Sequence, residues 1–460
     1  MEAETRNDLP EVACPGCVMR DRKIAELEAR LAKVEALVRS GKRQAAPFSK
    51  GVPKPNPKPP GRKSGENYGE HHRRAVPSRI DEVLEAPLPQ RCPFCSGEVR
   101  ETEVVPQYQT EIPRTVIHRQ INVHIGHCMC CKERVQGRHA LQTSDALGAC
   151  AIQIGPDAQA LAVQLNKDAG LRHGKVAGVF KAAFDLDLAR SAACRIMLRA
   201  AKRCEPAYQA IVRRVRQSSF IVPDETGWRI GGLLAWLHAA VGDDATAYLI
   251  HRRRGYEAAV ELIGCDYEGF LIHDGWSPYE QFDLATHQTC LAHLLRRAHE
   301  MEDSAVGGAV RFPRAIKAIF QQALAVRDQR DAGELTPLQA REQARLLREQ
   351  LDRLVIPHKT NADNERFAKF LCRQQESLFT FPEFEGVDAT NHRGEQAIRP
   401  AVVNRKVWGG NRTQTGAEAQ SILMSVIRTA AQRGIETMSF ISGTLKATLG
   451  QLPNLFPNTA

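Results

Sequence analysis

The order of strand-like and helix-like segments between residues 217 and 301 most restricts the fold of this chain. Patterning predicts strands at residues 220–222, 233–241 and 246–252, a helix at 256–263, and further strands at 269–273 and 288–291. The order is three strands, a helix, a strand, a short connection and a last strand. Such an order predicts a mixed α/β sheet.

A chain of 460 residues is longer than one hydrophobic core usually supports, so we expect several domains and a multidomain α+β fold class. The predicted parts are a short coiled-coil segment (1–40), a basic Pro-rich linker (41–80), a zinc-ribbon domain (81–145), a helical helix-turn-helix region (146–216), the first part of the α/β core (217–301), an all-helical insertion (302–388), and the second part of the core with the C-terminal helices (389–460).

Apolar residues recur at heptad spacing in residues 20–39, at Ile24, Leu27, Leu31, Val34 and Val38. The stretch is shorter than three heptads and is marginal as an isolated helix. Coiled-coil dimerisation and packing against the chain's own domain remain equal alternatives.

The net charge of +10 is concentrated in the linker, where residues 41–80 hold ten Lys and Arg residues against two Glu residues. Proline at six positions between residues 47 and 60 prevents regular helix there. A solvated tether is one interpretation. We favour an arm that lies along a phosphate backbone, because such arms gain affinity by releasing counterions. The cations proposed to bind DNA are Lys54, Lys58, Arg62 and Lys63.

Two Cys-x-x-Cys pairs predict a structural Zn²⁺ ion held by Cys92, Cys95, Cys128 and Cys131. Free buried cysteines are the alternative, and Cys130 is a possible replacement ligand. A further pair, Cys14 and Cys17, has no obvious second half. The polar N-terminus does not resemble a signal peptide, and no apolar run reaches the ~20 residues of a membrane span. We therefore expect a cytoplasmic, nucleoid-associated protein without a membrane partner.

Residues 155–215 have a helical pattern throughout. Two stretches, 175–184 and 188–202, are separated by a short break, which suits a helix-turn-helix that reads DNA. An ordinary helical hairpin has the same pattern.

Two aspartates are predicted to end neighbouring strands. Asp224 is expected at the end of the first strand, after Pro223, and Asp274 at the end of the fourth. If these strands are adjacent, the two carboxylates meet at one edge and repel each other unless a cation lies between them. Divalent magnesium suits such a site, and a third carboxylate would complete a two-metal site. An aspartate after a strand also commonly caps the next turn, which is the simpler interpretation.

The third carboxylate is Glu395. Arg399 is four residues further along the same predicted helix face, and Arg405, Lys406 and Arg412 follow. A metal-binding carboxylate flanked by phosphate-binding cations is the functional interpretation, and an exposed Glu–Arg pair is the simpler one.

Several motifs together resemble the insertion sequence 66 family of DDE transposases. They are Asp224-Glu-Thr-Gly-Trp228, His273-Asp-Gly-Trp276, Cys290-Leu-Ala-His293-Leu-Leu-Arg296-Arg297, Asn391-x-x-x-Glu395-Gln-Ala-Ile-Arg399-Pro400, Arg405-Lys406 and Gly409-Gly-Asn-Arg412. The resemblance spans almost the whole chain, with His392 standing where many relatives carry a second Asn.

The resemblance implies a ribonuclease-H-like core with Asp224, Asp274 and Glu395 as catalytic residues that hold two Mg²⁺ or Mn²⁺ ions. It implies cleavage of transposon ends and strand transfer into double-stranded target DNA. We also expect a homo-oligomer and possible element-encoded accessory proteins. His293, Arg296 and Arg297 could contact the DNA backbone, although ordinary surface charge is an alternative. The rival functions are a DNA-binding regulator with an inactive core and a nuclease or resolvase that never joins DNA.

Overall fold

The computed structural model describes residues 153–447 continuously, with residues 451–457 and shorter stretches nearer the N-terminus. Those stretches are 23–25, 27–28, 31, 76–84, 86–87, 89–91, 95–98, 100, 104–109, 115–139, 141–142 and 146–147. The chain divides into two compact units, residues 1–112 and 113–460, and the division falls inside the predicted zinc-ribbon range. Cys14, Cys17, Cys92 and the linker cations Lys54, Lys58, Arg62 and Lys63 lie outside the described residues.

In the first unit, residues 23–25, 27–28 and 31 are helical, as the heptad pattern predicts. The apolar side chains of this pattern that the structure describes are exposed, with exposed fractions of 46% for Ile24, 51% for Leu27 and 60% for Leu31. Dimerisation through them stays a prediction.

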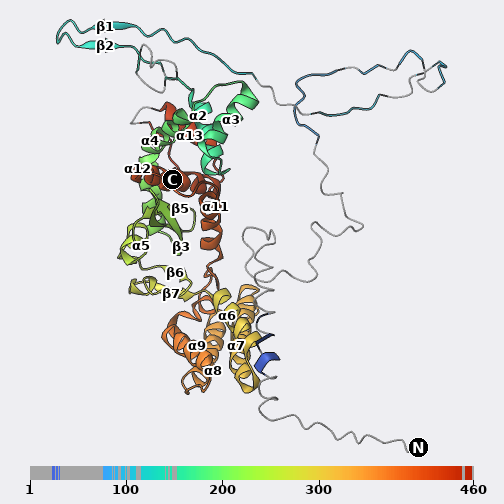
Figure 1. Cartoon of the computed structure of the whole chain (residues 1–460), viewed down its shortest axis with the longest axis vertical. Helices are drawn as coiled ribbons and strands as arrows, with labels where there is room; N and C mark the ends of the chain where they lie inside the picture. Colours follow the sequence, from blue (N-terminus) through green and yellow to red (C-terminus); the bar gives the residue numbers. More distant parts are fainter. Residues whose placement is uncertain are drawn as a thin grey trace, which may run out of the picture. The chain divides into compact units, whose positions relative to one another are not determined.

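The second unit contains two sheets and most of the helices. Its strands are β1 (Ile125–His127), β2 (Arg134–Gln136), β3 (Phe220–Ile230), β4 (Leu233–Val241), β5 (Thr246–His251), β6 (Phe270–His273) and β7 (Thr286–Thr289). Its α-helices are α2 (Pro156–Lys167), α3 (His173–Phe184), α4 (Arg190–Arg216), α5 (Tyr256–Ile263), α6 (Leu291–Ser304), α7 (Arg311–Asp331), α8 (Pro337–Val355), α9 (Ala362–Arg373), α10 (Thr380–Glu383), α11 (His392–Trp408), α12 (Gln414–Gln432) and α13 (Thr437–Lys446). Figure 1 shows their arrangement.

The five-stranded sheet has the order β5-β4-β3-β6-β7, which confirms the expected mixed α/β sheet. The strands β3, β4 and β5 are antiparallel neighbours, whereas β6 is parallel to both β3 and β7. The first and fourth core strands along the chain, β3 and β6, are therefore adjacent, which is the condition under which Asp224 and Asp274 were predicted to lie together. Two boundaries were predicted wrongly: β3 continues to Ile230, and β7 begins at Thr286.

Helix α12 covers the outer edge of β5. The hydroxyl groups of Thr429, Ser425 and Ser421, spaced four residues apart on one helix face, accept hydrogen bonds from backbone amides of β5 at 3.0, 2.8 and 2.9 Å. These amides would otherwise be unpaired at a sheet edge.

The opposite edge, at β7, is covered by residues that follow the insertion helices. The Thr380 hydroxyl donates to the His287 carbonyl oxygen at 2.6 Å, and the Phe381 amide donates to the Gln288 side-chain oxygen at 2.9 Å. Both edges of the sheet are thus occupied by other parts of the same unit.

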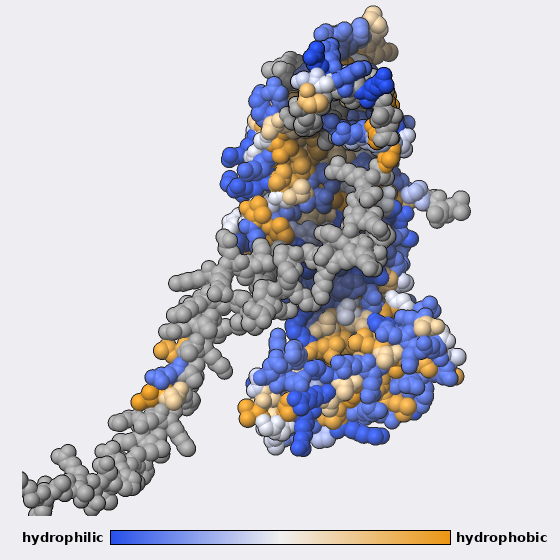
Figure 2. Space-filling model, turned by 90° about the vertical axis from the view of Figure 1, so that its right-hand side faces the viewer, coloured by the Kyte–Doolittle hydropathy of each residue, from blue (hydrophilic) through white to orange (hydrophobic). Residues whose placement is uncertain are grey.

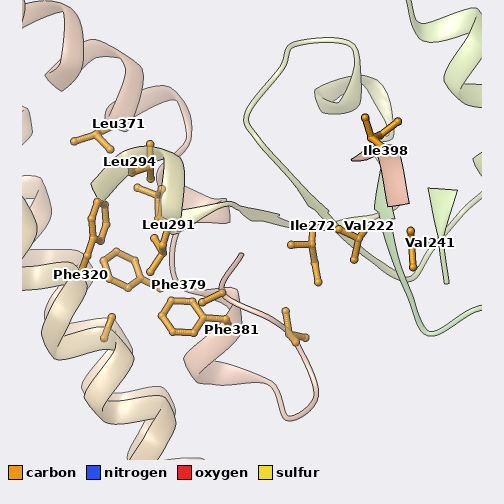
Figure 3. Packing of buried hydrophobic residues seen from close by; sticks show 14 of the residues in the cluster. Val222, Val241, Ile272, Leu291, Leu294, Phe320, Leu371, Phe379, Phe381 and Ile398 are labelled. Carbon is orange, nitrogen blue, oxygen red and sulfur yellow. The ribbon is translucent and has the colours of Figure 1, made fainter. Parts of the chain in front are cut away.

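One hydrophobic core continues from the sheet into the helical insertion. Figure 3 shows Val222, Val241, Ile272 and Ile398 at the sheet, and Leu291, Phe320 and Phe379 among the helices of the same cluster. A second cluster joins α2–α5, α12 and α13 to the sheet. The surface of the insertion, the lower body in Figure 2, is largely hydrophilic.

Residues 302–388 are helical, as the sequence predicts. Thr336 caps α8 with a full capping box, in which the Thr336 hydroxyl accepts from the Gln339 amide and the Gln339 side chain accepts from the Thr336 amide. The last helix, α13, was not predicted. No helix in the part of the chain that the structure describes is both long and apolar enough to cross a membrane.

Candidate active site

Asp224 lies inside β3, opposite Ala239 of β4, and not at the end of the strand as predicted. Pro223 was expected to end the strand. This is wrong for the pairing of β3 with β4, which continues to Ile230, but the pairing of β3 with β6 does stop before Pro223. The Phe270 amide donates to the Ser219 carbonyl oxygen, and the pairing ends at Ile221 and Leu271. In a parallel ladder alternate residues face the same neighbour, so the next donor after Ile221 would be residue 223, and proline has no amide hydrogen.

Asp274 follows β6 directly and its carboxylate caps the next turn. Its Oδ1 accepts a hydrogen bond from the Trp276 amide at 3.0 Å, and Gly275 adopts a φ of +87°, which favours glycine. The turn-capping interpretation is therefore correct for this residue. It does not exclude a role in metal binding, because a carboxylate has several lone pairs.

Two histidines, His273 and His287, stabilise the turn after Asp274 through a chain of hydrogen bonds. The Gly275 amide donates to Nδ1 of His273, so Nε2 carries the proton and donates to Nδ1 of His287 at 3.0 Å. His287 Nε2 in turn donates to the Phe282 carbonyl oxygen at 3.0 Å. Burial lowers the pKa of His273 to about 3, which keeps this chain of neutral imidazoles intact near neutral pH.

Glu395 lies in the first turn of α11, and this helix packs directly on β3. A Cβ atom added at Gly394 would lie 3.1 Å from the Asp224 Cβ and 3.2 Å from the Pro223 carbonyl oxygen. The Tyr248 hydroxyl donates to the Ala397 carbonyl oxygen at 2.9 Å and fixes the same end of the helix. The contact at Gly394 therefore brings Glu395 to Asp224. Sequence reasoning missed Gly394, although a glycine inside a helical pattern is itself a signal of close packing.

The carboxylates of Asp224, Asp274 and Glu395 lie within electrostatic reach of one another. Burial, with the negative charges of Glu225, Asp274 and Glu395, raises the pKa of Asp224 to about 7, although a backbone hydrogen bond from Glu225 opposes the shift. Glu395 is half-exposed, and its Oε1 lies 3.5 Å from Nε2 of His293 on α6. Of the three residues predicted from the sequence, Asp224 thus feels the charges of the other two, but the three carboxylates do not stand close enough to share one ion.

The donor set suits a hard divalent cation. Asp224 is destabilised as an anion by its neighbours, and a cation would reverse that effect. The side-chain oxygen of Asn391, at the start of α11, is buried and accepts no hydrogen bond within the described residues. No three His, Cys, Asp or Glu side chains in that part of the chain stand close enough to share one ion. Magnesium typically takes only one or two carboxylates together with substrate phosphates, so pairs of these residues fit it.

The cations predicted to bind DNA have different environments. Arg296 and Arg399 are exposed near the site, whereas Arg297 lies over the rings of Phe367 and Phe370, 4.6 and 5.5 Å from their centroids. Arg297 is thus used for packing against α9. His293, predicted as a backbone contact, lies beside Glu395 instead.

The basic stretch after α11 docks on the tip of the β3–β4 hairpin. Asn411 pairs with Ile230, and its side-chain oxygen accepts a hydrogen bond from the buried Trp228 indole at 2.8 Å. A Cβ at Gly410 would lie 2.4 Å from the Arg229 carbonyl oxygen, so only glycine fits there. Arg405 and Lys406 in the last turn of α11, and Arg412 just beyond it, surround this anchored segment.

The two helices predicted as a helix-turn-helix are present, but the second is longer than expected. Helix α4 has 27 residues, and one face along its whole length packs in the same core as α12 and the sheet. The exposed cations of its N-terminal half are Arg190, Arg195, Arg199 and Lys202.

Among the cysteines proposed to bind zinc, Cys128 and Cys131 lie at the turn between β1 and β2. The Cys128 amide donates to the Glu133 carbonyl oxygen at 2.9 Å and the Lys132 amide donates to the Cys128 carbonyl oxygen at 3.0 Å. Backbone hydrogen bonds from Cys131 and Cys130 lower the pKa of the Cys128 thiol. A thiolate is the form that binds a metal, so the turn favours such a role. Cys95 is exposed in the other unit.

Comparison with known proteins gives one result that covers the site. The family model described as "Transposase IS66 family" matches residues 152–419, a range that contains all three carboxylates and extends from α2 into α12. A search of curated proteins found no match.

Proposed function

Because the chain belongs to the IS66 family of transposases, we propose that it is a metal-dependent enzyme that cleaves DNA at the ends of its transposable element and joins them to target DNA. The observation that supports this proposal is that the negative charges of Asp274 and Glu395 both reach the buried Asp224, whose pKa is raised to about 7. Three carboxylates from β3, β6 and α11 repel one another unless divalent cations join them. The strand order of the sheet also supports a ribonuclease-H-like core.

In this proposal, Asp224, Asp274 and Glu395 hold two Mg²⁺ or Mn²⁺ ions. When bound, such ions polarise the attacking oxygen and stabilise the leaving oxygen of an in-line displacement. The protein supplies positioning and charge. His293 orients Glu395, the histidine pair His273–His287 fixes the Asp274 turn, and Arg399 neutralises the phosphate. No side chain forms a covalent bond with the DNA, so catalysis depends on alignment.

The decisive test compares Asp224→Asn, Asp274→Asn and Glu395→Gln with Glu334→Gln, an exposed carboxylate on the turn between α7 and α8. DNA carrying the element's ends is incubated with Mg²⁺ or Mn²⁺, and nicked and joined products are scored. Each site variant is expected to lose cleavage by on the order of a thousandfold while binding DNA, because the three residues act as a unit. The control should cleave normally, and retained cleavage in any site variant removes that residue from the proposal.

The same assay separates the rival functions. A regulator with an inactive core would bind the ends without metal-dependent nicking. A nuclease or resolvase would nick DNA but never join a 3′ end to a second duplex.

End recognition is proposed to use α3, the exposed cations on the N-terminal half of α4 and the basic linker. Deleting residues 1–215 would not be a clean test, because α4 also forms part of the core. The variant Arg195→Ala/Lys202→Ala is better, and it should weaken end binding and its salt dependence without loss of folding. Structural zinc at Cys92, Cys95, Cys128 and Cys131, a homo-oligomer and accessory proteins complete the proposal.

A further inference from the structure

Three consecutive arginines, Arg252–Arg254, follow β5, and the last of them pairs with Glu225, the neighbour of Asp224 in β3. We propose that Arg254 binds a phosphate of the DNA strand that passes through the active site, and that Trp236, Trp276 and Glu225 hold its side chain in place for this contact. The inference deepens the proposed function and rests on it, because it names a further residue that contacts the substrate.

The guanidinium group of Arg254 packs against two indole rings. Its central carbon is 4.7 Å from the ring centroid of Trp236, on β4, and 4.4 Å from that of Trp276, in the turn after Asp274. Its Nε and Nη2 atoms both donate to Oε1 of Glu225, at 3.1 and 2.8 Å. The Tyr279 hydroxyl donates to the other oxygen of the same carboxylate at 2.7 Å.

These contacts fix the guanidinium but leave one edge available. The Glu225 side chain is 4% exposed, whereas the Arg254 side chain is 43% exposed. Within the part of the chain that the structure describes, Nη1 of Arg254 has no hydrogen-bond partner shorter than 3.5 Å. An arginine held by two aromatic rings and along one edge has already lost much of its rotamer entropy, so a ligand at the remaining edge binds at a smaller entropic cost.

The loop itself is also anchored. The buried His238 makes a hydrogen bond of 3.2 Å through Nε2 to the Arg253 carbonyl oxygen, and His251 accepts from the Arg253 amide at 3.1 Å. The position of Arg254 is therefore set by β3, β4, β5 and the turn after β6 together.

This position borders the carboxylates. Glu225 follows Asp224 in β3, and its carboxylate feels the charge of Asp274. Successive residues of a strand point to opposite faces, so Glu225 and Arg254 lie across β3 from Asp224 and Glu395, whereas the charge of Asp274 reaches both Asp224 and Glu225. A DNA strand that reaches Asp224 and Asp274 meets an acidic centre that repels its phosphates. Arg254 offers charge compensation on the face that Glu395 does not occupy.

A purely structural ion pair with Glu225 is the alternative. It explains the two hydrogen bonds to Oε1, but it does not need an exposed guanidinium edge. The two interpretations differ in one measurable respect: only the proposed contact depends on a DNA phosphate charge.

The experiment measures binding, without divalent metal, of the full chain to a duplex that carries one end of its element. Arg254→Ala is compared with the wild type and with Arg253→Ala, a neighbouring and more exposed arginine that pairs with Glu257. Arg254→Ala should weaken binding about tenfold and reduce the salt slope by about 1, with a smaller effect for Arg253→Ala. Duplexes with a single neutral methylphosphonate at successive positions then locate the contact. At one position near the cleavage site, the neutral phosphate should weaken DNA binding by the wild type about tenfold. The same substitution should not weaken DNA binding by Arg254→Ala any further.

The inference would be overturned if the neutral phosphate weakened binding by Arg254→Ala as much as binding by the wild type at every position. It would also be overturned if Arg253→Ala and Arg254→Ala weakened binding equally. Thermal melting shows whether Arg254→Ala folds. If it does not, Arg254→Lys is used in its place and should show weaker coupling at the same phosphate. Wild-type nicking with Mg²⁺ is scored separately. Absent nicking contradicts the proposed function, whereas nicking with no coupled phosphate contradicts only the role of Arg254.

Discussion

Replacing Gly394 by alanine tests whether contact between α11 and β3 aligns Glu395 with Asp224. The new Cβ would lie 3.1 Å from the Asp224 Cβ, and 3.2 and 3.3 Å from the carbonyl oxygens of Pro223 and Val222. Carbon atoms in ordinary contact are about 3.5–4.0 Å apart, so the start of α11 must move by about 0.4 Å. None of the three atoms is the end of a flexible side chain, so the helix has to give way.

The expected effect on stability is small and the effect on activity is larger. Overpacking costs about 1–3 kcal/mol, and the helix preference for alanine over glycine returns up to about 1 kcal/mol. The net loss in the free energy of unfolding is therefore roughly 0–3 kcal/mol. A 1 Å misplacement can cost on the order of a hundredfold in rate, so a shift of about 0.4 Å should slow nicking about fivefold. Gly394→Val should abolish nicking.

The assay combines denaturant unfolding with metal-dependent nicking of end DNA. Gly178→Ala, in α3, is the stability control, because a Cβ there meets nothing within 4 Å and should simply stabilise its helix. If Gly394→Ala gained as much stability as this control and nicked DNA at the wild-type rate, the proposed role of the contact would be wrong.

Three further predictions follow from the same geometry. The raised pKa of Asp224, about 7 against a usual value of 3.8, means that its contribution to stability is present below about pH 4 and lost as the pH rises through 7. Asp224→Asn should therefore melt at a higher temperature than the metal-free wild type above pH 7, and Mg²⁺ should stabilise only the wild type; equal melting temperatures would contradict this. Asn411→Ala removes the acceptor of the buried Trp228 indole and should lower the free energy of unfolding by about 1–3 kcal/mol in denaturant titrations, whereas an unchanged value would show that the bond contributes nothing. Purified protein should contain about one zinc per chain by elemental analysis, and Cys128→Ser should lose it, unlike Ser substitution of the buried Cys204.

Local pattern was sufficient for the order of the strands along the chain, whereas the adjacency of β3 and β6, on which the proximity of Asp224 and Asp274 depends, was a condition of the prediction that the sheet fulfils. The length of β3 was not predictable in this way, because Pro223 interrupts pairing on one side only and the strand continues against β4. The start of β7 was also missed. Gln288 and Thr289 are fully buried polar residues whose hydrogen bonds go to residues 374–381, about ninety positions away, and periodicity cannot reveal such partners.

Glu395 was proposed from its spacing to Arg399 and the basic stretch that follows, and the family resemblance supported it, since no spacing rule connects it to residues more than a hundred positions earlier. Its place depends on tertiary contacts, at Gly394 and at Tyr248, that have no local signature. The same holds for Arg254, whose partners Glu225, Trp236 and Trp276 come from three different segments.

The hydroxyl row of α12 and the Thr380–Phe381 segment have a consequence for assembly. If copies of the chain assemble, adding one subunit's sheet to another's would be a simple way to join them. Here three amides of β5 already donate to α12, and the outer side of β7 already contacts the Thr380–Phe381 segment. Both outermost strands are therefore covered by the chain itself, which disfavours growth into a continuous intermolecular sheet.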